Sequence, residues 1–197
     1  MKHDEGYIKF NLEWKEQSFD FPDSLYHSIQ TWRQKLFDLN LVGVYPDGVG
    51  FGNLSIRYHN HQFIITGSAT GNFKQLTQKH YALVKDFELD RNTIYAVGRT
   101  RASSESLSHA AIYQSNQKVN AVIHIHHQKF WEKYLNKLPT TPANATFGTP
   151  EMAREISKLA ASEKGIIIMG GHPEGIMAFG KSLNEAGEIV FNHYQKL

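Results

Sequence analysis

Two histidines separated by one residue, His124 and His126, are the strongest chemical signal in the sequence. They end a run of β-branched residues that predicts a strand over residues 119–126, and alternate side chains of a strand point to the same face. Two neighbouring imidazoles suit a zinc-like ion, whose bonds to nitrogen are about 2.0–2.1 Å long. Ile123 and Ile125 would then face the core. The alternative is an exposed strand face on which two histidines happen to fall.

His172 is the candidate third ligand, because it directly follows the apolar strand predicted over residues 166–169, at a glycine turn. Taken by itself, it would be interpreted as an ordinary turn residue. Three histidines that leave one coordination position open form a catalytic zinc arrangement. The sequence therefore contains the ligand types of a metal site.

Glu105 follows Ser103 and Ser104 where a helix is predicted to begin and to extend to about residue 116. A helix N-terminus stabilises anions, so the two serines and the free N–H groups could hold a phosphate. Glu105 is a candidate general base near the metal, or a surface carboxylate favoured by the helix dipole. His109, one turn later, could support Glu105 or form a salt bridge with it.

A second candidate anion site is the loop of small and hydroxyl residues over residues 66–71, which includes Ser68. Backbone N–H groups and hydroxyls of such a loop can close on an anion. An ordinary turn is the alternative.

The elements that must position these residues follow from hydrophobic alternation and turn signals. Strands are predicted over residues 7–14 (an edge strand), 50–58, 62–66, 81–87, 93–97, 119–126, 165–169 and 176–179. Helices are predicted over residues 22–40, 103–116 and 129–135, after the start signal Thr149-Pro150, and from the capping box Ser182–Glu185 to the C-terminus. The hairpins favour an α/β fold whose mostly antiparallel sheet is covered by helices.

Composition limits the function classes. The 197 residues are 41% hydrophobic and 20% charged, which suits one globular domain over residues 1–197. A net charge of +2 gives no nucleic-acid footprint, and the absence of cysteine excludes disulfides and thiolate sites. The N-terminus lacks the apolar stretch of a signal peptide, and the longest apolar run, residues 165–169, is too short to span a bilayer. A cytoplasmic protein without nucleic-acid or membrane partners is expected.

Taken together, these residues resemble the class II aldolase/adducin family, which includes L-fuculose-phosphate aldolases and L-ribulose-phosphate 4-epimerases. The matching segments occur in the family's order over roughly residues 25 to 190: Gly52–Arg57, Thr66–Ser68, Ser103–Glu105, His124–His126, Phe147–Thr149 and His172. The resemblance implies a three-layer α/β/α fold around the antiparallel sheet. It also implies a homo-oligomer, commonly a cyclic tetramer with its sites at subunit interfaces.

The resemblance further implies roles for single residues. Zn²⁺ would be bound by His124, His126 and His172, and Glu105 matches the fourth ligand or general base of the aldolases. The residues that fall where the family binds substrate phosphate are Asn53, Ser68, Ser103 and Ser104.

The implied reaction is that of a zinc-dependent aldolase-type lyase on a small phosphorylated sugar. Zn²⁺ would stabilise an enediolate while Glu105 moves the proton. The related epimerases tend to carry aspartate at this position. A sugar-phosphate dehydratase and a 4-epimerase are the alternatives within the family, and a non-catalytic adducin-like interaction module is the alternative outside enzymes. The presence of all three histidines and Glu105 argues against the module.

Three departures from the family pattern bear on the reaction. Residues 127–149 omit the stretch that carries the tyrosine general acid, for which Tyr134 and Tyr194 are possible substitutes. The phosphate loop has one extra residue around positions 69–71. A longer turn after His172 brings in Glu174, either as a second carboxylate near the metal or as a solvent-facing residue.

Overall fold

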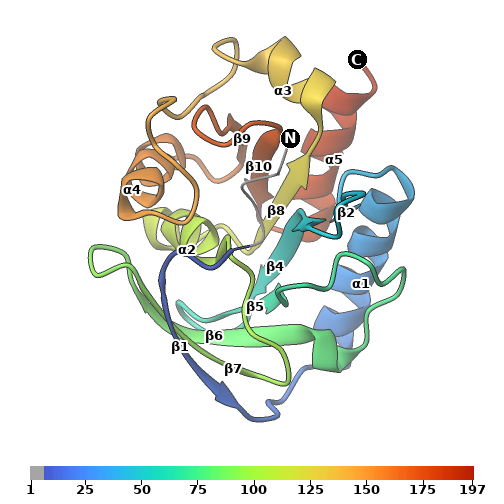
Figure 1. Cartoon of the computed structure of the whole chain (residues 1–197), viewed down its shortest axis with the longest axis vertical. Helices are drawn as coiled ribbons and strands as arrows, with labels where there is room; N and C mark the ends of the chain where they lie inside the picture. The colour runs from blue at the N-terminus through green and yellow to red at the C-terminus, as the bar shows by residue number, and fades with distance from the viewer. Residues whose placement is uncertain (1–6) are drawn as a thin grey trace.

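A computed structural model describes residues 7–197 as a large sheet with helices on both faces (Figure 1). The sheet has eight strands in the order β1-β7-β6-β5-β4-β8-β10-β9. Their bounds are β1 Asn11–Glu16, β4 Asn53–Arg57, β5 Phe63–Thr66, β6 Tyr81–Glu88, β7 Thr93–Gly98, β8 Ala121–His126, β9 Gly165–Ile168 and β10 Gly175–Gly180. β2 (Gly43–Val44) and β3 (Gly50–Phe51) form a separate two-stranded ribbon.

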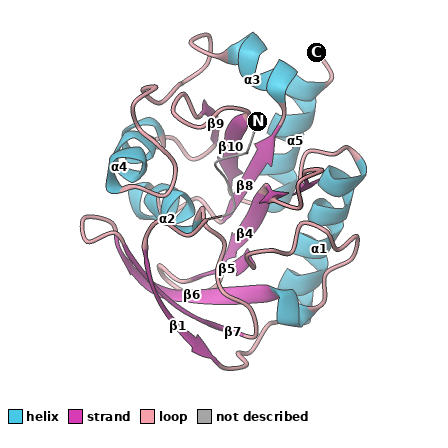
Figure 2. Cartoon of the chain, in the orientation of Figure 1, coloured by secondary structure: helices cyan, strands magenta, loops and turns pink. Residues whose placement is uncertain are grey.

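The helices form two layers, which Figures 1 and 2 show on either side of the sheet. Their bounds are α1 Asp23–Asp38, α2 Ser106–Ser115, α3 Gln128–Tyr134, α4 Pro150–Leu159 and α5 Leu183–Tyr194, with a short 3₁₀ turn at Gln78–His80. α1 and α5 pack on one face, and α2 with α4 covers the other. The three-layer α/β/α architecture expected from the sequence is confirmed.

The sheet is mostly antiparallel, as predicted. Within it, β1 pairs with β7 in parallel, and the remaining neighbouring strands pair antiparallel. β1 is the expected edge strand, although it begins at Asn11 rather than Tyr7. The predicted hairpin of β4 and β5 is present, and Asn60 in its turn adopts a left-handed φ of 48°, which asparagine tolerates better than most residues.

The capping signals place two helix starts correctly. The Thr149 side chain accepts a hydrogen bond from Met152 N and Pro150 is the first residue of α4, so the missing proline N–H costs nothing there. Ser182 accepts from Glu185 N at the start of α5. The Glu185 carboxylate accepts from Lys181 N rather than completing the box on Ser182. Sequence-local hydrogen bonds thus set both helix boundaries.

The start predicted for α2 is wrong. The helix begins at Ser106 with Glu105 at the N-cap position, and neither Ser103 nor Ser104 caps it with its side chain. Backbone geometry explains the difference: the Ser103 carbonyl accepts from both the N–H and the hydroxyl of Ser106 and closes the turn itself. The Ser103 hydroxyl accepts a 3.4 Å hydrogen bond from Glu105 N, and both Ser103 and Ser104 line a cavity.

Alternation along β8 separates core from site. Ile123 and Ile125 face the core, as predicted, in a cluster that includes Trp32 and Leu36 of α1 and Val190 of α5. Val122, His124 and His126 share the opposite face, and Val122 belongs to the core cluster under α2 and α4. The two histidines are therefore fully covered rather than exposed on a strand face.

No helix within residues 7–197 is long and apolar enough to cross a membrane.

Candidate metal centre and adjoining cavity

Three histidine rings converge at one end of the sheet. His126 Nε2 lies 3.0 Å from His124 Nε2 and 3.1 Å from His172 Nε2, and all three side chains are buried. His124 and His126 come from β8, whereas His172 comes from the turn between β9 and β10. The antiparallel pairing of β10 with β8 sets Gly175 opposite His126 and so brings this turn beside the pair.

The hydrogen bonds behind two of these rings fix which nitrogen carries the proton. His124 Nδ1 lies 3.1 Å from the carbonyl oxygen of Ile176, and a carbonyl can only accept, so Nδ1 is the donor. His126 Nδ1 lies 3.0 Å from the Tyr45 hydroxyl, which donates its own proton to Glu174 Oε2 at 2.8 Å. His126 Nδ1 must therefore donate to Tyr45. In neutral rings, both Nε2 atoms then present lone pairs to each other.

This arrangement fits a divalent metal ion. Two unprotonated ring nitrogens 3.0 Å apart repel each other unless a cation lies between them. Tetrahedral zinc with bonds of about 2.0–2.1 Å holds its nitrogen ligands about 3.3 Å apart, close to the observed spacing. Neutral imidazole with its other nitrogen held by a hydrogen bond is also the usual form of a ligand histidine. The three side chains can thus hold a metal ion.

Glu105 lies beside this triad. Its Oε1 is 3.8 Å from His172 Nε2, and the side chain is almost fully buried. Burying a carboxylate is costly unless positive charge is near. A cation among the histidines would compensate the charge of Glu105, so the carboxylate and the triad favour the same occupant.

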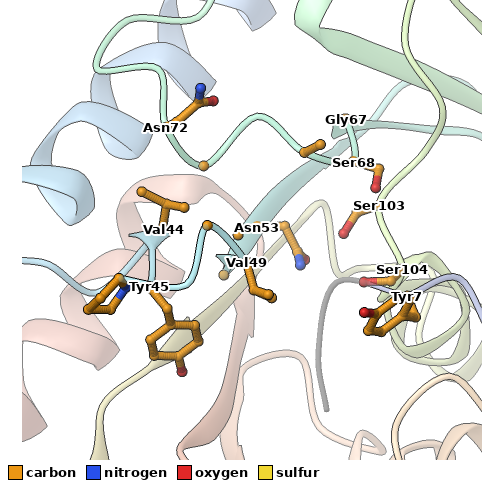
Figure 3. A pocket seen from close by; sticks show the side chains of 16 residues that line it. Tyr7, Val44, Tyr45, Val49, Asn53, Gly67, Ser68, Asn72, Ser103 and Ser104 are labelled. Atoms are coloured by element: carbon orange, nitrogen blue, oxygen red, sulfur yellow. The ribbon is translucent and has the colours of Figure 1, made fainter. Parts of the chain in front are cut away.

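A cavity of about 650 Å³ is lined by residues that neighbour the triad, among them Tyr45, which lies 3.0 Å from His126 Nδ1. All four residues predicted to bind phosphate line it together: Asn53, Ser68, Ser103 and Ser104 (Figure 3). Asn53 pairs with His124 in the sheet register and so links the cavity to the cluster of His124, His126, His172 and Glu105, which we call the metal corner. Its Oδ1 is buried without a hydrogen-bond partner among the described residues, which marks a polar atom left for a ligand.

A buried arginine of α1 forms hydrogen bonds with the backbone of the loop that carries Ser68. Arg33 of α1 donates to the carbonyls of Lys74, Thr70 and Gly71, at 2.8, 3.5 and 3.4 Å. Burial lowers the pKa of this guanidinium from its ordinary value, with Tyr81 and Asp38 opposing the shift. The loop is therefore anchored through its backbone rather than through its own side chains.

Two tyrosines line the cavity, and the sequence reasoning missed both. Tyr7 and Tyr45 border it (Figure 3), Tyr45 from the loop between β2 and β3. The predicted substitutes for the general acid do not line the cavity within one chain. The Tyr134 hydroxyl donates to His193 O at 3.2 Å, and the Tyr194 ring packs edge-on against His127. The Tyr-Pro-Asp-Gly turn signal at Tyr45 gave no indication of chemistry.

Glu174 was expected to be either a second carboxylate near the metal or a solvent-facing residue, and it matches neither description in full. It is half-buried with a positive φ of 68°, and its carboxylate contacts Tyr45 rather than solvent alone. His109, a candidate partner of Glu105, turns its Nδ1 to Ser55 Oγ at 2.6 Å. Burial lowers the pKa of His109 to about 3, so the ring is neutral. His109 is part of the core.

The sequence matches a known family. Residues 47–131 match the family model described as the class II aldolase and adducin N-terminal domain. This segment contains Asn53, Ser68, Glu105, His124 and His126. The family match over these residues agrees with the fold and the arrangement of the site, and the predicted resemblance to the class II aldolase/adducin family is confirmed.

Solved structures of the same fold extend the comparison over most of the chain. An L-fuculose 1-phosphate aldolase is similar with a TM-score of 0.68 and 21% identity, covering 89% of this chain and 84% of that one. The L-fuculose-1-phosphate aldolase from Thermus thermophilus gives 0.64 and 20%, covering 88% and 91%. YgbL from Escherichia coli, a putative aldolase/epimerase/decarboxylase, gives 0.64 and 18%, covering 86% and 84%. No curated protein matches the sequence.

Proposed function

We propose that this chain is a zinc-dependent aldolase-type lyase that acts on a small phosphorylated sugar. The observation that carries the proposal is the convergence of three ring nitrogens beside a buried carboxylate and a cavity of about 650 Å³. Two of these nitrogens, of His124 and His172, lie within 3.1 Å of the third, His126 Nε2. The similar solved structures named as sugar-phosphate aldolases support the substrate class. When bound, the ion would act as a Lewis acid that stabilises negative charge on substrate oxygens.

The cavity wall would bind the phosphate. Asn53, Ser68, Ser103 and Ser104 offer an amide and three hydroxyls around one space, and none of the four is a charged group. Neutral donors on a rigid wall can fix the position of an anion without competing for the metal. The substrate's reacting carbons would then lie between this wall and the histidines.

Glu105 would be the general base. It lies beside His172, next to Ser104 at the end of the cavity, and its burial removes the water that would otherwise compete for its proton. A positioned base of this kind contributes about 10²–10⁴-fold to a rate. Moving a proton at the carbon next to a carbonyl is common to aldol cleavage and dehydration of a ketose phosphate.

The family's alternative reactions differ in what must protonate the product. Within one chain, Tyr7 and Tyr45 are the tyrosines that border the cavity. The expected tetramer stays a prediction, and the exposed side chains of Tyr7 and Val44 at the cavity rim are those that a neighbouring subunit would cover. A non-catalytic interaction module is disfavoured because it has no use for the buried triad.

The test begins with the metal. Purified protein should contain stoichiometric zinc by elemental analysis, and His124→Ala should lose it. The zinc-loaded protein is then screened against ketose and aldose phosphates, with products identified by NMR. Stoichiometric zinc missing from wild type, or zinc content unaffected by His124→Ala, would sink the proposal.

Glu105→Gln separates metal binding from chemistry. We expect this variant to keep its zinc while exchange of the substrate C–H proton with D₂O slows by about 10²–10⁴-fold. Glu188→Gln, at an exposed position of α5, is the matched control and should exchange at the wild-type rate. Unchanged exchange in Glu105→Gln would assign the base to another residue.

A further inference from the structure

We propose that Tyr45 and Glu174 act together as a hydrogen-bonded relay that orients His126 and strengthens it as a metal ligand. The proposal rests on the metal centre described above. It assigns a positioning role to two residues that lie outside the ligand set. They come from distant parts of the chain, the loop between β2 and β3 and the turn between β9 and β10.

The geometry allows one direction of proton donation. The Tyr45 hydroxyl lies 2.8 Å from Glu174 Oε2 and 3.0 Å from His126 Nδ1. A carboxylate only accepts, and a hydroxyl has a single proton. The two hydrogen bonds therefore run in one direction: His126 Nδ1–H donates to the Tyr45 oxygen, and the Tyr45 O–H donates to Glu174. Together they turn His126 Nε2, with its lone pair, toward the other two histidines.

The relay places negative charge behind one ligand and not behind another. His124 has a neutral backbone carbonyl behind its Nδ1, whereas His126 has a tyrosine hydrogen-bonded to a carboxylate. A carboxylate behind a ligand histidine raises its basicity and fixes its orientation. His126 is also the central ligand, because its Nε2 is within 3.1 Å of the other two. Strengthening this ring would affect the whole site.

Both relay residues are held in place by their surroundings. Tyr45 closes a turn through its backbone, with its N–H on Val49 O at 2.8 Å, and its ring packs on Phe51 at 4.4 Å between centroids. Glu174 has a φ of 68°, and its carbonyl accepts from His127 N at 3.0 Å. A left-handed non-glycine residue is strained, and such strain persists where the surrounding structure requires the side chain. A glycine would adopt this φ with less backbone strain, so we infer that the glutamate side chain is present for the contact that it makes with Tyr45.

The experiment measures zinc affinity by competition with a chromophoric chelator, and ligand geometry from the visible spectrum of the Co²⁺-substituted protein. Tyr45→Phe keeps the ring and removes the hydroxyl, and Glu174→Gln keeps the shape and removes the charge. We expect each to weaken zinc binding by about 10–100-fold and to shift the Co²⁺ bands. Because the two act in series, the double variant should lose little more than Tyr45→Phe alone.

Two further variants exclude a merely structural effect. Tyr95→Phe removes a comparable tyrosine–glutamate hydrogen bond, 2.6 Å to Glu88, at the far end of the sheet and should leave zinc affinity unchanged. Glu174→Gly should raise the melting temperature of the metal-free protein, because it relieves the positive φ, while weakening zinc binding. A side chain with only a structural role would not move these two quantities in opposite directions.

The outcomes separate this inference from the proposed function. Wild-type protein that binds no zinc would overturn the metal centre and the relay with it. Wild-type protein that binds zinc, with Tyr45→Phe, Glu174→Gln and Glu174→Gly all within twofold of it, would overturn the relay alone. Weaker binding in Tyr45→Phe and Glu174→Gln, with Tyr95→Phe unchanged, supports the relay.

Discussion

Two buried polar clusters lie where β4 meets α2. They are two residues apart along β4 and one helical turn apart along α2. At one end, Asn53 of β4 lines the cavity and Glu105 adjoins the histidine triad. Two residues further along β4, Ser55 bridges His109 and Tyr113 of α2, at 2.6 and 2.8 Å. Asn53 and Ser55 share one face of the sheet, and His109 lies one helical turn after Glu105.

The two clusters differ in how their polar atoms are paired. Around His109, the Ser55 hydroxyl lies between the ring Nδ1 and the Tyr113 hydroxyl, while Nε2 is buried without a hydrogen-bond partner among the described residues. Burial lowers the pKa of the histidine to about 3, so it stays neutral. In the metal corner, nitrogen lone pairs face one another and a carboxylate lies beside them. A buried histidine is therefore not evidence for a site by itself. Evidence for a metal site comes instead from ring nitrogens whose lone pairs converge with no proton between them.

The largest expected effect is on stability in the presence of zinc. Zinc at 1,000 times its dissociation constant should raise the free energy of unfolding by about 4 kcal/mol, because it binds the folded chain. His172→Ala should lose this increase, whereas His109→Gln should keep it. Urea denaturation of each protein with zinc and with chelator provides the measurement. A zinc-induced increase that disappears in His109→Gln would contradict the distinction between the two clusters.

Sequence spacing and the family's motif order together found the metal corner. Two histidines at alternate positions of a β-branched strand must share a face, and the motif order supplied His172 from 46 residues away. The same reasoning could not assign His109, because its partner Ser55 lies 54 residues earlier and its role depends on which helix face meets the sheet. Local spacing predicts same-element neighbours, whereas partners across elements depend on packing.

Elements with strong local signals were predicted correctly for the same reason. Periodicity and caps determine α1, α4 and α5, and turn residues determine the hairpin of β4 and β5. The start of α2 was wrong because a backbone carbonyl performs the capping that the serines were expected to perform. Tyr45 was missed because it lies in a turn and meets His126 from 81 residues away.

The next expected effect is on stability in acid. The pKa of His109 falls from 6.5 to about 3 on folding, so the unfolded chain binds a proton that the folded chain does not. Stability that is fully present above pH 6.5 is therefore lost as the pH falls, at about 1.4 kcal/mol per unit, or about 3 kcal/mol by pH 4.5. His109→Gln should lack this contribution. Urea denaturation of both metal-free proteins from pH 7 to pH 4.5 measures it.

The control for the acid experiment is the comparison of wild type with His109→Gln. The metal corner is the same in both metal-free proteins, so any contribution that it makes cancels in the difference between wild type and His109→Gln. An equal loss of stability in the two proteins would mean that His109 takes up a proton in the folded state, which would contradict its assignment as a neutral core residue.

The smallest expected effect concerns Ser55, whose hydroxyl bonds both His109 and Tyr113. Ser55→Ala leaves the buried Nδ1 of His109 without its partner, and we expect a loss of about 2 kcal/mol in the free energy of unfolding at pH 7. Ser115→Ala removes a hydroxyl that donates to Ala111 O at 2.8 Å on the same helix, and should change stability by less than about 0.5 kcal/mol. Zinc affinity should be unchanged in both variants, because Ser55 bonds only to groups of its own cluster among the described residues. If Ser55→Ala weakened zinc binding as well as stability, α2 would have to transmit the change from His109 to Glu105, and the two clusters would be one coupled network.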